Sequence, residues 1–443
     1  MNFFVQNLKI NGCKNIDKEI NINFYNNTLS NNIDLQNSSI KAIYGPNGAG
    51  KSGIMSALYI YKRLLCEKNS LNDSYFRNFV AECINKYNNK LSIKITLLNF
   101  DDYDVYQCTI KHEITLEKNN YGVKIVEEKI SELSGRRIKE DKFKDNIVIK
   151  LGTIENIIND DNNLIKNNSM NLLDNNSIVA AVENLYLQNY EVKKWTTLLD
   201  LFVLKLFAIE LTVELNKEDK HLDYLSNKQF LEDMVDKTKF YYEILNKQIN
   251  DKLELSAIYD DVIPVEKFNE YEKMIDNLSS FIKIFKPDLK RIEIDKKIND
   301  KVYKCKKIFI YDNYPIDMEF ESTGIKKLVR LYTNFKKYVN GGVVFIDEMD
   351  ANLHDVYFTK LIEFFKYEAK GQLCFTTHNL EPIDVLKDNK YALEFLSNDS
   401  RIASWVKGGR QSPMNKYVNG LIPYSTFNVD STNFEVLLED SNE

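Results

Sequence analysis

The chain has 443 residues, more than one ordinary hydrophobic core accommodates, so we expect two or three structural lobes. Its formal net charge of −6 and isoelectric point near 5.6 exclude a globally basic surface, and contact with nucleic acid would need a local patch. The six cysteines form no Cys-x2-Cys pair, and the four histidines do not cluster with them. Structural zinc and a disulfide framework are therefore not expected.

Neither a secretion signal nor a membrane span is expected. The N-terminus lacks the basic and long apolar regions of a signal peptide. The most membrane-like stretch, Trp195–Leu211, is interrupted by Asp200, Lys205 and Glu210, and these charges disfavour a spanning helix. We expect a cytoplasmic protein with no membrane contact.

The first predicted elements are a strand pair, a loop and a strand that leads into a helix. Apolar and polar residues alternate between Phe4 and Phe24, as in half-buried strands. Residues 26–39 are rich in Asn and Ser and are predicted to form a loop. The apolar run Ala42–Tyr44 is typical of a short buried strand, and apolar residues recur at helical spacing from Ile54 onward.

The junction between this strand and this helix carries a nucleotide-binding pattern. It fills every fixed position of Gly-x4-Gly-Lys-[Ser/Thr], in the order Gly45-Pro46-Asn47-Gly48-Ala49-Gly50-Lys51-Ser52. Glycines here let backbone N–H groups face phosphate oxygens at the positive end of the helix dipole. We expect Lys51 to neutralise the β- and γ-phosphates of ATP and Ser52 to bind Mg²⁺. The predicted nucleotide-binding residues of this loop are Gly45, Asn47, Gly48, Gly50, Lys51 and Ser52.

The residues after the loop helix predict a β-subdomain followed by a helical region. Period-two alternation over 91–97, 105–116 and 123–126 indicates strands beside the nucleotide. Residues 136–175 are polar without a clear period and are expected to form surface segments and short helices. Apolar stripes at helical spacing then indicate helices, over 230–249 and 268–285.

These patterns suggest a nucleotide-binding head whose two halves are far apart in the sequence. The N-terminal half, with the phosphate-binding loop and the β-subdomain, spans 1–135. A mostly helical insertion spans 136–290. The C-terminal half and the tail span 291–443.

The C-terminal half carries a second nucleotide-binding pattern. Strand-like segments occur at 307–311 and 318–320, and a helix is predicted over 325–338. The apolar run that follows ends in Asp347 and Glu348, which is typical of a buried parallel strand with carboxylates at its C-terminal end. In this Walker B pattern Asp347 would hold hydrated Mg²⁺, and Glu348 would act as general base toward the attacking water.

A further buried strand, Gln372–Thr377, ends in His378. The strand follows a predicted helix that contains Phe358 and Phe365, so it can return to the same edge of the sheet. We expect His378 to hydrogen-bond the γ-phosphate. The alternative is a histidine with a purely structural role.

Together these motifs resemble the ATP-binding-cassette (ABC) ATPases of the RecF, Rad50 and SMC type. Residues 321–325 (Glu-Ser-Thr-Gly-Ile) sit where that family carries its Leu-Ser-Gly-Gly-Gln signature, and residues 349–354 sit at its D-loop. The resemblance implies an α/β fold: an ABC-type P-loop head with a mixed sheet, flanking helices and a β-subdomain, plus the mostly helical insertion. It also implies two heads that sandwich two ATP molecules. Ser322 and Gly324 would then contact the γ-phosphate bound to the second protomer, and Asp350 would lie near the dimer interface.

The signature departs from the family pattern at two positions. Thr323 replaces the first signature glycine, and Ile325 stands where glutamine is usual. We therefore expect ATP hydrolysis that is slow or depends on a trigger. A plain helix N-cap formed by Ser322 is the alternative interpretation. Gln107 is a candidate for the glutamine-loop residue of the family.

More narrowly, residues 321–324 and 346–354 resemble ATPases of the overcoming-lysogenization-defect (OLD) type and their relatives in bacterial abortive-infection systems. In that group an ATPase often works with a nuclease or toxin. The segment after His378 is too short for a fused Toprim nuclease, and an Arg-x4-His ribonuclease motif is absent. We therefore expect a homodimer or higher homo-oligomer that acts with a separate effector protein in anti-phage defence.

Other functions remain open at this point. A RecF-like DNA repair or maintenance ATPase is one alternative, although the acidic balance disfavours it. A partner protein that binds ATP with little turnover is another, although Glu348 favours hydrolysis. The tail contains an aromatic and basic cluster that suggests nucleic-acid or partner contact, or else a turn and closing strand of the head; it comprises Trp405, Lys407, Arg410, Lys416 and Tyr417.

Overall fold

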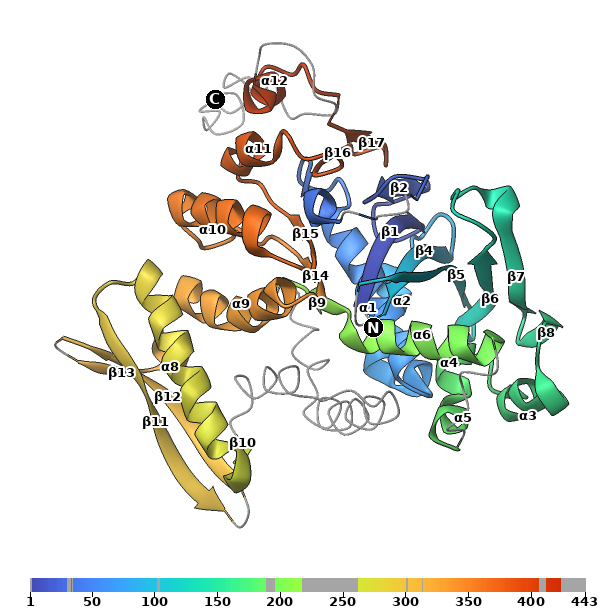
Figure 1. Ribbon diagram of the computed structural model, residues 1–443, viewed down its shortest axis with the longest axis horizontal. Coiled ribbons are helices and arrows are strands. Elements are labelled where there is room, and N and C mark those ends of the chain that lie inside the picture. The colour runs from blue at the N-terminus through green and yellow to red at the C-terminus, as the bar shows by residue number, and fades with distance from the viewer. Residues whose placement is uncertain are drawn as a thin grey trace, which may run out of the picture.

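The computed structural model describes residues 2–29, 33, 35–101, 104–188, 196–216, 262–299, 302–312, 314–405 and 412–423. An α/β core lies between an antiparallel β-subdomain and a smaller module in which one long helix covers a sheet (Figure 1). The predicted α/β class, with a mixed sheet and flanking helices, is confirmed.

The core sheet has the strand order β17-β16-β3-β15-β14-β9 and is parallel except for β17. The strands are β3 Ile40–Tyr44, β9 Thr212–Glu214, β14 Val343–Ile346, β15 Gln372–Thr376, β16 Leu393–Leu396 and β17 Ile402–Ser404. β3, β14, β15 and β16 are buried along their whole length, and the two charges among them, Lys41 of β3 and Glu394 of β16, form a buried ion pair at 2.8 Å. Parallel pairing brings the C-terminal ends of β3, β15 and β14 to one edge, the edge at which ligands of α/β sheets bind.

Helices cover both faces of the core sheet (Figure 1). Successive strand residues point to opposite faces, so Val343 and Phe345 pack toward one hydrophobic core, and Val344 and Ile346 pack toward another. The helices of the first core are α1 Lys51–Cys66, α2 Ser74–Cys83, α3 Leu164–Ser169, α4 Ile178–Ala181, α5 Glu183–Gln188 and α6 Thr196–Glu210. The helices of the second are α9 Thr323–Val339, α10 Asp355–Glu368, α11 Glu381–Leu386 and α12 Pro413–Val418.

The apolar stretch that resembles a membrane span forms α6, a buried helix that packs on α1. Its buried charges have partners. Lys205 Nζ lies 3.3 Å from the Glu183 carboxylate and donates to the Cys66 carbonyl at the end of α1, at 2.7 Å. Asp200 accepts a hydrogen bond from Asn146 Nδ2 at 2.6 Å. Among the described residues, no helix is long and apolar enough to cross a membrane.

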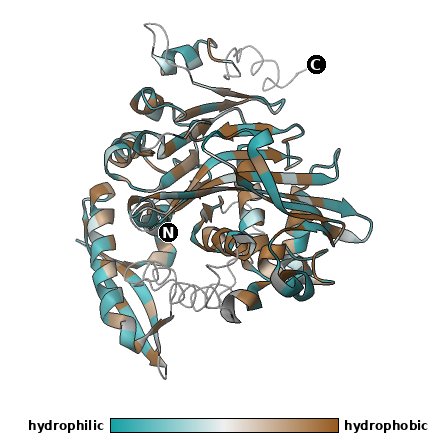
Figure 2. Ribbon diagram, turned by 45° about the vertical axis from the view of Figure 1, so that its right-hand side comes forward, coloured by the Kyte–Doolittle hydropathy of each residue, from teal (hydrophilic) through white to brown (hydrophobic). Residues whose placement is uncertain are grey.

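The β-subdomain is an antiparallel sheet with the strand order β2-β1-β4-β5-β6-β7-β8. Hydrophobic and hydrophilic residues alternate along its strands (Figure 2). Its strands are β1 Asn2–Asn11, β2 Ile20–Asn23, β4 Lys90–Phe100, β5 Tyr106–Asn119, β6 Gly122–Leu133, β7 Phe143–Lys150 and β8 Thr153–Ile157. The predicted strand pair and the predicted period-two strands all lie in this sheet.

Strands β7 and β8 correct the expectation that residues 136–175 lack strands. They extend the β-subdomain beyond the boundary expected at residue 135. Only Asn146, Ile147 and Ile149 of β7 are buried, and the polar residues before them leave too short an alternation to detect in the sequence. Residues 143–157 therefore belong with the N-terminal strands and not with a helical insertion.

The smaller module consists of α8 Phe268–Phe285 packed on the strands β10 Val262–Pro264, β11 Leu289–Asn299, β12 Val302–Tyr311 and β13 Pro315–Asp317. α8 matches the predicted helix. The expected boundary at 290/291 would divide the module, because β11 crosses it and pairs with β12 along nearly its whole length.

Two further expectations are corrected here. Residues 318–320 form a short 3-10 helix and not a strand, because the Asp317 carboxylate accepts a hydrogen bond from the backbone of Glu319. β9, which was expected to lie in the insertion, is a strand of the core sheet and pairs with β14. The helix predicted over 230–249 lies outside the described residues.

Helix α9 joins the module to the core. Leu331 and Phe335 pack in the core that includes β14, whereas Ile325 and Leu328 pack against α8 and β12. Because one amphipathic helix serves both cores, a displacement of the module would move the N-terminal end of α9.

Two tail residues pack on the head. Trp405 donates from its ring nitrogen to the Lys387 carbonyl at 3.1 Å, and the Tyr417 ring lies 5.3 Å from that of Phe395. β17 closes the edge of the core sheet. These contacts match the interpretation of this tail as a closing strand and turn; Lys407 and Arg410 lie outside the described residues.

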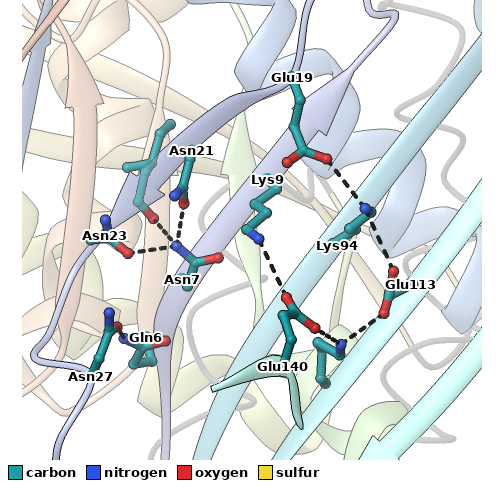
Figure 3. A network of polar contacts seen from close by, with 12 residues as sticks. Gln6, Asn7, Lys9, Glu19, Asn21, Asn23, Asn27, Lys94, Glu113 and Glu140 are labelled. Atoms are coloured by element: carbon teal, nitrogen blue, oxygen red, sulfur yellow. Dashed lines mark hydrogen bonds and ion pairs between the residues drawn. The ribbon is translucent and has the colours of Figure 1, made fainter. Parts of the chain in front are cut away.

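The outer face of the β-subdomain carries a chain of alternating charges (Figure 3). Lys9 and Lys111 both contact Glu140, at 3.4 and 2.6 Å. Glu113 bridges Lys111 and Lys94, and Lys94 also contacts Glu19. Neighbouring carboxylates therefore neutralise Lys9, Lys94 and Lys111.

Candidate nucleotide site

A pocket of about 960 Å³ opens at the C-terminal edge of the core sheet. The phosphate-binding loop follows β3, Glu348 follows β14 and His378 follows β15, and all of them line this pocket. Its other wall is formed by residues from the β1–β2 connection and from the segment after α2. The sequence-predicted residues that the fold brings together here are Asn47, Gly48, Gly50, Lys51, Ser52, Glu348 and His378.

The phosphate-binding loop requires glycine for conformational and steric reasons. Gly48 and Gly50 have φ values of 81° and 101°, in the left-handed region that side chains disfavour. A Cβ atom on Gly45 would lie 2.5 Å from the Leu396 carbonyl oxygen. Gly50 is also the N-cap of α1, so the unpaired N–H groups of the first helical turn lie beside the pocket.

Lys51 lies folded over its own loop. Its ammonium group donates to the carbonyl oxygens of Gly45 and Pro46, at 2.6 and 3.0 Å. Desolvation lowers the pKa of Lys51, and the nearby Asp347, Glu348 and Asp350 carboxylates oppose that shift. A phosphate oxygen would provide the ammonium group with a charged partner, which is a stronger acceptor than a carbonyl.

The Walker B acids are tied to the neighbouring strand. Asp347 Oδ1 accepts a hydrogen bond from the Thr376 hydroxyl at 2.6 Å, and that hydroxyl accepts one from the Glu348 backbone at 2.7 Å. The ends of β14 and β15 therefore form one unit.

The residues present fit Mg²⁺ held jointly with phosphate. Ser52 and Asp347 offer a hydroxyl and a carboxylate, the oxygen ligands that Mg²⁺ prefers. Over the described ranges, no group of three or more His, Cys, Asp or Glu side chains is placed to hold a metal alone.

Glu348 has a φ of 44°, and two side chains fix its position. Asn216 donates from Nδ2 to Glu348 Oε2 at 2.6 Å, and Lys327 donates to the Glu348 carbonyl. Desolvation lowers the pKa of Lys327 to about 8.

Sequence reasoning missed Asn216 because the strand before it, β9, has only three residues. Asn216 lies two residues after the end of β9, and β9 pairs with β14 so that Glu214 lies opposite Ile346. By contrast, Gln107 lies in β5, where its side chain bonds to Asp101 and to the Val105 carbonyl. Gln107 does not line the pocket, so its candidacy as the glutamine-loop residue is not supported.

His378 and Asp350 are linked through the backbone. The His378 side chain is exposed and lines the pocket, and its N–H donates to Asp350 Oδ2 at 3.3 Å. Desolvation, and next the charge of Lys51, lower the pKa of His378. The imidazole is therefore neutral at pH 7 and able to donate one hydrogen bond. Asp350 does not line the pocket, and its Oδ1 atom is buried without a partner in the described part of the chain.

The signature segment lies away from the pocket of its own chain. The Ser322 hydroxyl accepts from the Ile325 backbone at 3.3 Å, so Ser322 is the N-cap of α9. A Cβ atom on Gly324 would lie 2.6 Å from the Asn352 carbonyl oxygen, which gives this glycine a steric reason. Ser322 and Thr323 are exposed, and neither they nor Gly324 line the pocket.

Comparison with known proteins finds one family model, which matches residues 221–384 and is described as "AAA domain, putative AbiEii toxin, Type IV TA system". The matched segment contains Asp347, Glu348 and His378 but not the phosphate-binding loop. No curated protein matches the chain significantly.

Solved structures similar to the chain include two SMC heads. One is the Smc head domain of Pyrococcus furiosus, with an extended coiled coil and bound to the C-terminal domain of ScpA: identity 17%, coverage 91% of this chain and 96% of that one, TM-score 0.42. The other is the SMC head domain of Thermotoga maritima: identity 13%, coverage 91% and 99%, TM-score 0.32.

Proposed function

We propose that this chain binds Mg²⁺–ATP in the pocket and hydrolyses it, as an ABC-type ATPase that switches between open and closed pairs of heads. The observation that carries this proposal is the convergence of Lys51, Ser52, Glu348 and His378 at one edge of a parallel sheet. These groups come from three strand ends, and together they supply a cation, a metal ligand, a carboxylate base and a neutral donor.

Each group has a role in phosphoryl transfer to water. The N–H groups at the start of α1 and the Lys51 ammonium bind the phosphates and neutralise charge that develops on the γ-phosphoryl oxygens. Glu348, held by Asn216, accepts a proton from the attacking water, and His378 donates to a γ-phosphate oxygen. Mg²⁺ held by Ser52 and Asp347 would neutralise charge on the β- and γ-oxygens.

The position of the signature supports assembly of two heads. Ser322 and Thr323 lie exposed at the start of α9, outside the pocket of their own chain. The start of a long helix favours anions, so it suits a γ-phosphate presented by a second copy. We propose a head-to-head dimer in which Ser322 acts on the partner's ATP.

Two observations favour a defence function with a separate effector over DNA maintenance. The description of the matched family model names a putative toxin of a toxin–antitoxin system. In addition, residues 321–324 and 346–354 resemble the motifs of abortive-infection ATPases. On the outer face of the β-subdomain, Lys9, Lys94 and Lys111 are each paired with a carboxylate. We propose that ATP drives closure of the two heads, and that this closure holds or releases a separate effector protein, which is a nuclease or a toxin, during anti-phage defence.

The direct test compares the wild type with Glu348→Gln in an ATPase assay with and without Mg²⁺, together with mass in solution. Because a general base contributes about 100-fold or more, Glu348→Gln should lose hydrolysis by that factor while it keeps ATP binding and accumulates ATP-bound dimer. Glu270→Gln, an exposed glutamate on α8, is the control and should match the wild type. Magnesium-dependent hydrolysis that is unchanged in Glu348→Gln would contradict the assigned base.

A further inference from the structure

The pocket continues beyond the phosphate-binding loop. This outer half is lined by Lys14, Asn15 and Asp17 from the β1–β2 connection and by Ile84, Asn85 and Tyr87 from the segment after α2. None of these residues belongs to the nucleotide motifs. The total volume of about 960 Å³ suits a complete small-molecule ligand. A nucleotide with its phosphates at Lys51 would therefore place its ribose and base in the outer half.

The two segments that line the outer half are bonded to each other. Lys14 N–H donates to the Cys83 carbonyl at 2.6 Å, and the Asn85 side chain donates to the Lys14 carbonyl at 2.8 Å. Asn15 Nδ2 donates to the Gly48 carbonyl at 2.8 Å, which ties the same wall to the phosphate-binding loop. The segment after α2 is thus held in register with the phosphate site.

Tyr87 projects from this fixed segment. Its N–H donates to Asn85 Oδ1 at 2.9 Å in a tight turn, and its side chain is 91% exposed. Tyr121 offers a direct comparison: its N–H donates to Asn119 Oδ1 at 2.9 Å in a similar turn, and it is 95% exposed. Tyr121 lies in the β5–β6 hairpin and does not line the pocket. The turn therefore accounts for the exposure of both tyrosines, and the two differ in that Tyr87 lines the pocket.

We propose that the Tyr87 ring stacks on the purine base of the bound nucleotide and that residues 84–88 form its base-binding loop. This inference rests on the proposed ATP-binding function. A planar base offers a π face that an exposed aromatic ring can cover, and the fixed backbone keeps the ordering cost low. Stacking does not read the hydrogen-bonding edge of a base, so Tyr87 strengthens ATP and GTP binding alike.

Calorimetric titration of the full chain tests the proposal, with Glu348→Gln as the parent so that ATP survives the measurement. Adding Tyr87→Ala should weaken Mg²⁺–ATP and Mg²⁺–GTP binding by about fivefold or more, the usual effect of removing a base-stacking ring. Tyr87→Phe keeps the ring and should stay within about twofold of the parent. Tyr121→Ala is the matched control and should bind as the parent does.

Binding of inorganic tripolyphosphate with Mg²⁺, a ligand without a base, distinguishes failure of this inference from failure of the proposed ATP-binding function. Its affinity should be equal in the parent and in Tyr87→Ala, which also shows that the variant is folded. If the parent binds ATP but Tyr87→Ala binds it as tightly as Tyr121→Ala does, base stacking on Tyr87 is refuted and the ATP site stands. If the parent binds neither ATP nor tripolyphosphate, both the proposed function and this inference fail.

Discussion

At the scale of single residues, Glu348 illustrates how neighbours position the proposed general base. Its side chain meets Asn216, which follows β9, and its carbonyl meets Lys327 of α9. Its backbone N–H is bound by Thr376 at the end of β15. Three different elements therefore determine where the carboxylate lies, and each can shift it without touching ATP.

Asn216→Ala tests this arrangement. Asn216 contacts the carboxylate but does not line the pocket, so the variant should lower kcat by about tenfold, a part of the roughly 100-fold or more that a general base contributes, and leave KM for ATP unchanged. Steady-state kinetics measure both constants. Asn419→Ala removes an exposed amide that bonds to Asn415 on α12 and serves as control. A rise in KM without a fall in kcat would place Asn216 in substrate binding instead.

At the scale of elements, α6 shows how a nearly all-apolar helix carries buried charges. Lys205 bonds to the carbonyls of Leu65 and Cys66, so a cation caps the C-terminal end of the helix that begins at the phosphate-binding loop. In the described part of the chain, the hydrogen-bond partner of Asp200 is the side-chain amide of Asn146. Desolvation raises the pKa of Asp200 to about 7, from an ordinary value of 3.8.

Asp200→Asn should therefore change stability in a pH-dependent way. A raised folded-state pKa means that the folded protein binds more protons than the unfolded chain between about pH 4 and pH 7, so wild-type stability falls as pH rises through this window. The variant lacks this loss and should be more stable than the wild type by about 1–3 kcal/mol at pH 8, with the difference vanishing near pH 4. Thermal unfolding at several pH values measures it.

Asp276→Asn, at an exposed position of α8, is the control for that experiment and should show no such trend. A constant difference between Asp200→Asn and the wild type from pH 4 to pH 8 would contradict an elevated pKa at this aspartate.

At the scale of the whole molecule, α9 connects the signature to the smaller module and to the core. Its N-terminal end carries Ser322 and contacts Asn352 near Gly324, while its two apolar faces belong to separate cores. A nucleotide beside Glu348, whose carbonyl accepts a hydrogen bond from Lys327 of α9, and a partner head at Ser322 would both act on this helix, which suits a switch between two assembled states.

Mixing two inactive variants tests whether the site is shared between protomers. Lys51→Ala removes the phosphate site, and Ser322→Asp keeps a good N-cap but places a negative charge toward the partner's γ-phosphate. Each alone should be inactive. Random pairing makes half of the dimers mixed, each with one intact composite site, so activity should return to about a quarter of wild type. A mixture no more active than its two components would refute action in trans.

Local patterns along the chain were sufficient for several predictions. The phosphate-binding loop, the acids after β14 and the strand before His378 each lie in a short segment whose residue types suit one conformation. Glycines with positive φ and a fully apolar strand such as β14 are each compatible with few other local conformations. The helix α9 and the strands β1, β4, β5 and β6 of the β-subdomain were likewise readable, because their periods persist over many residues.

Only the tertiary structure decided which distant segments meet. Asn216 reaches Glu348 because three-residue β9 pairs with β14, and no periodicity reveals so short a strand. Residues 143–157 join the N-terminal sheet through β6, and β11 pairs with the next strand, β12, in a hairpin; the polar residues of these strands leave little trace of alternation in the sequence. Tyr87 and Tyr121 occupy similar turns, and it is the fold that places one at the pocket and the other on a hairpin. Sequence determines local conformation and chemistry, whereas long-range pairing determines which chemistries share a site.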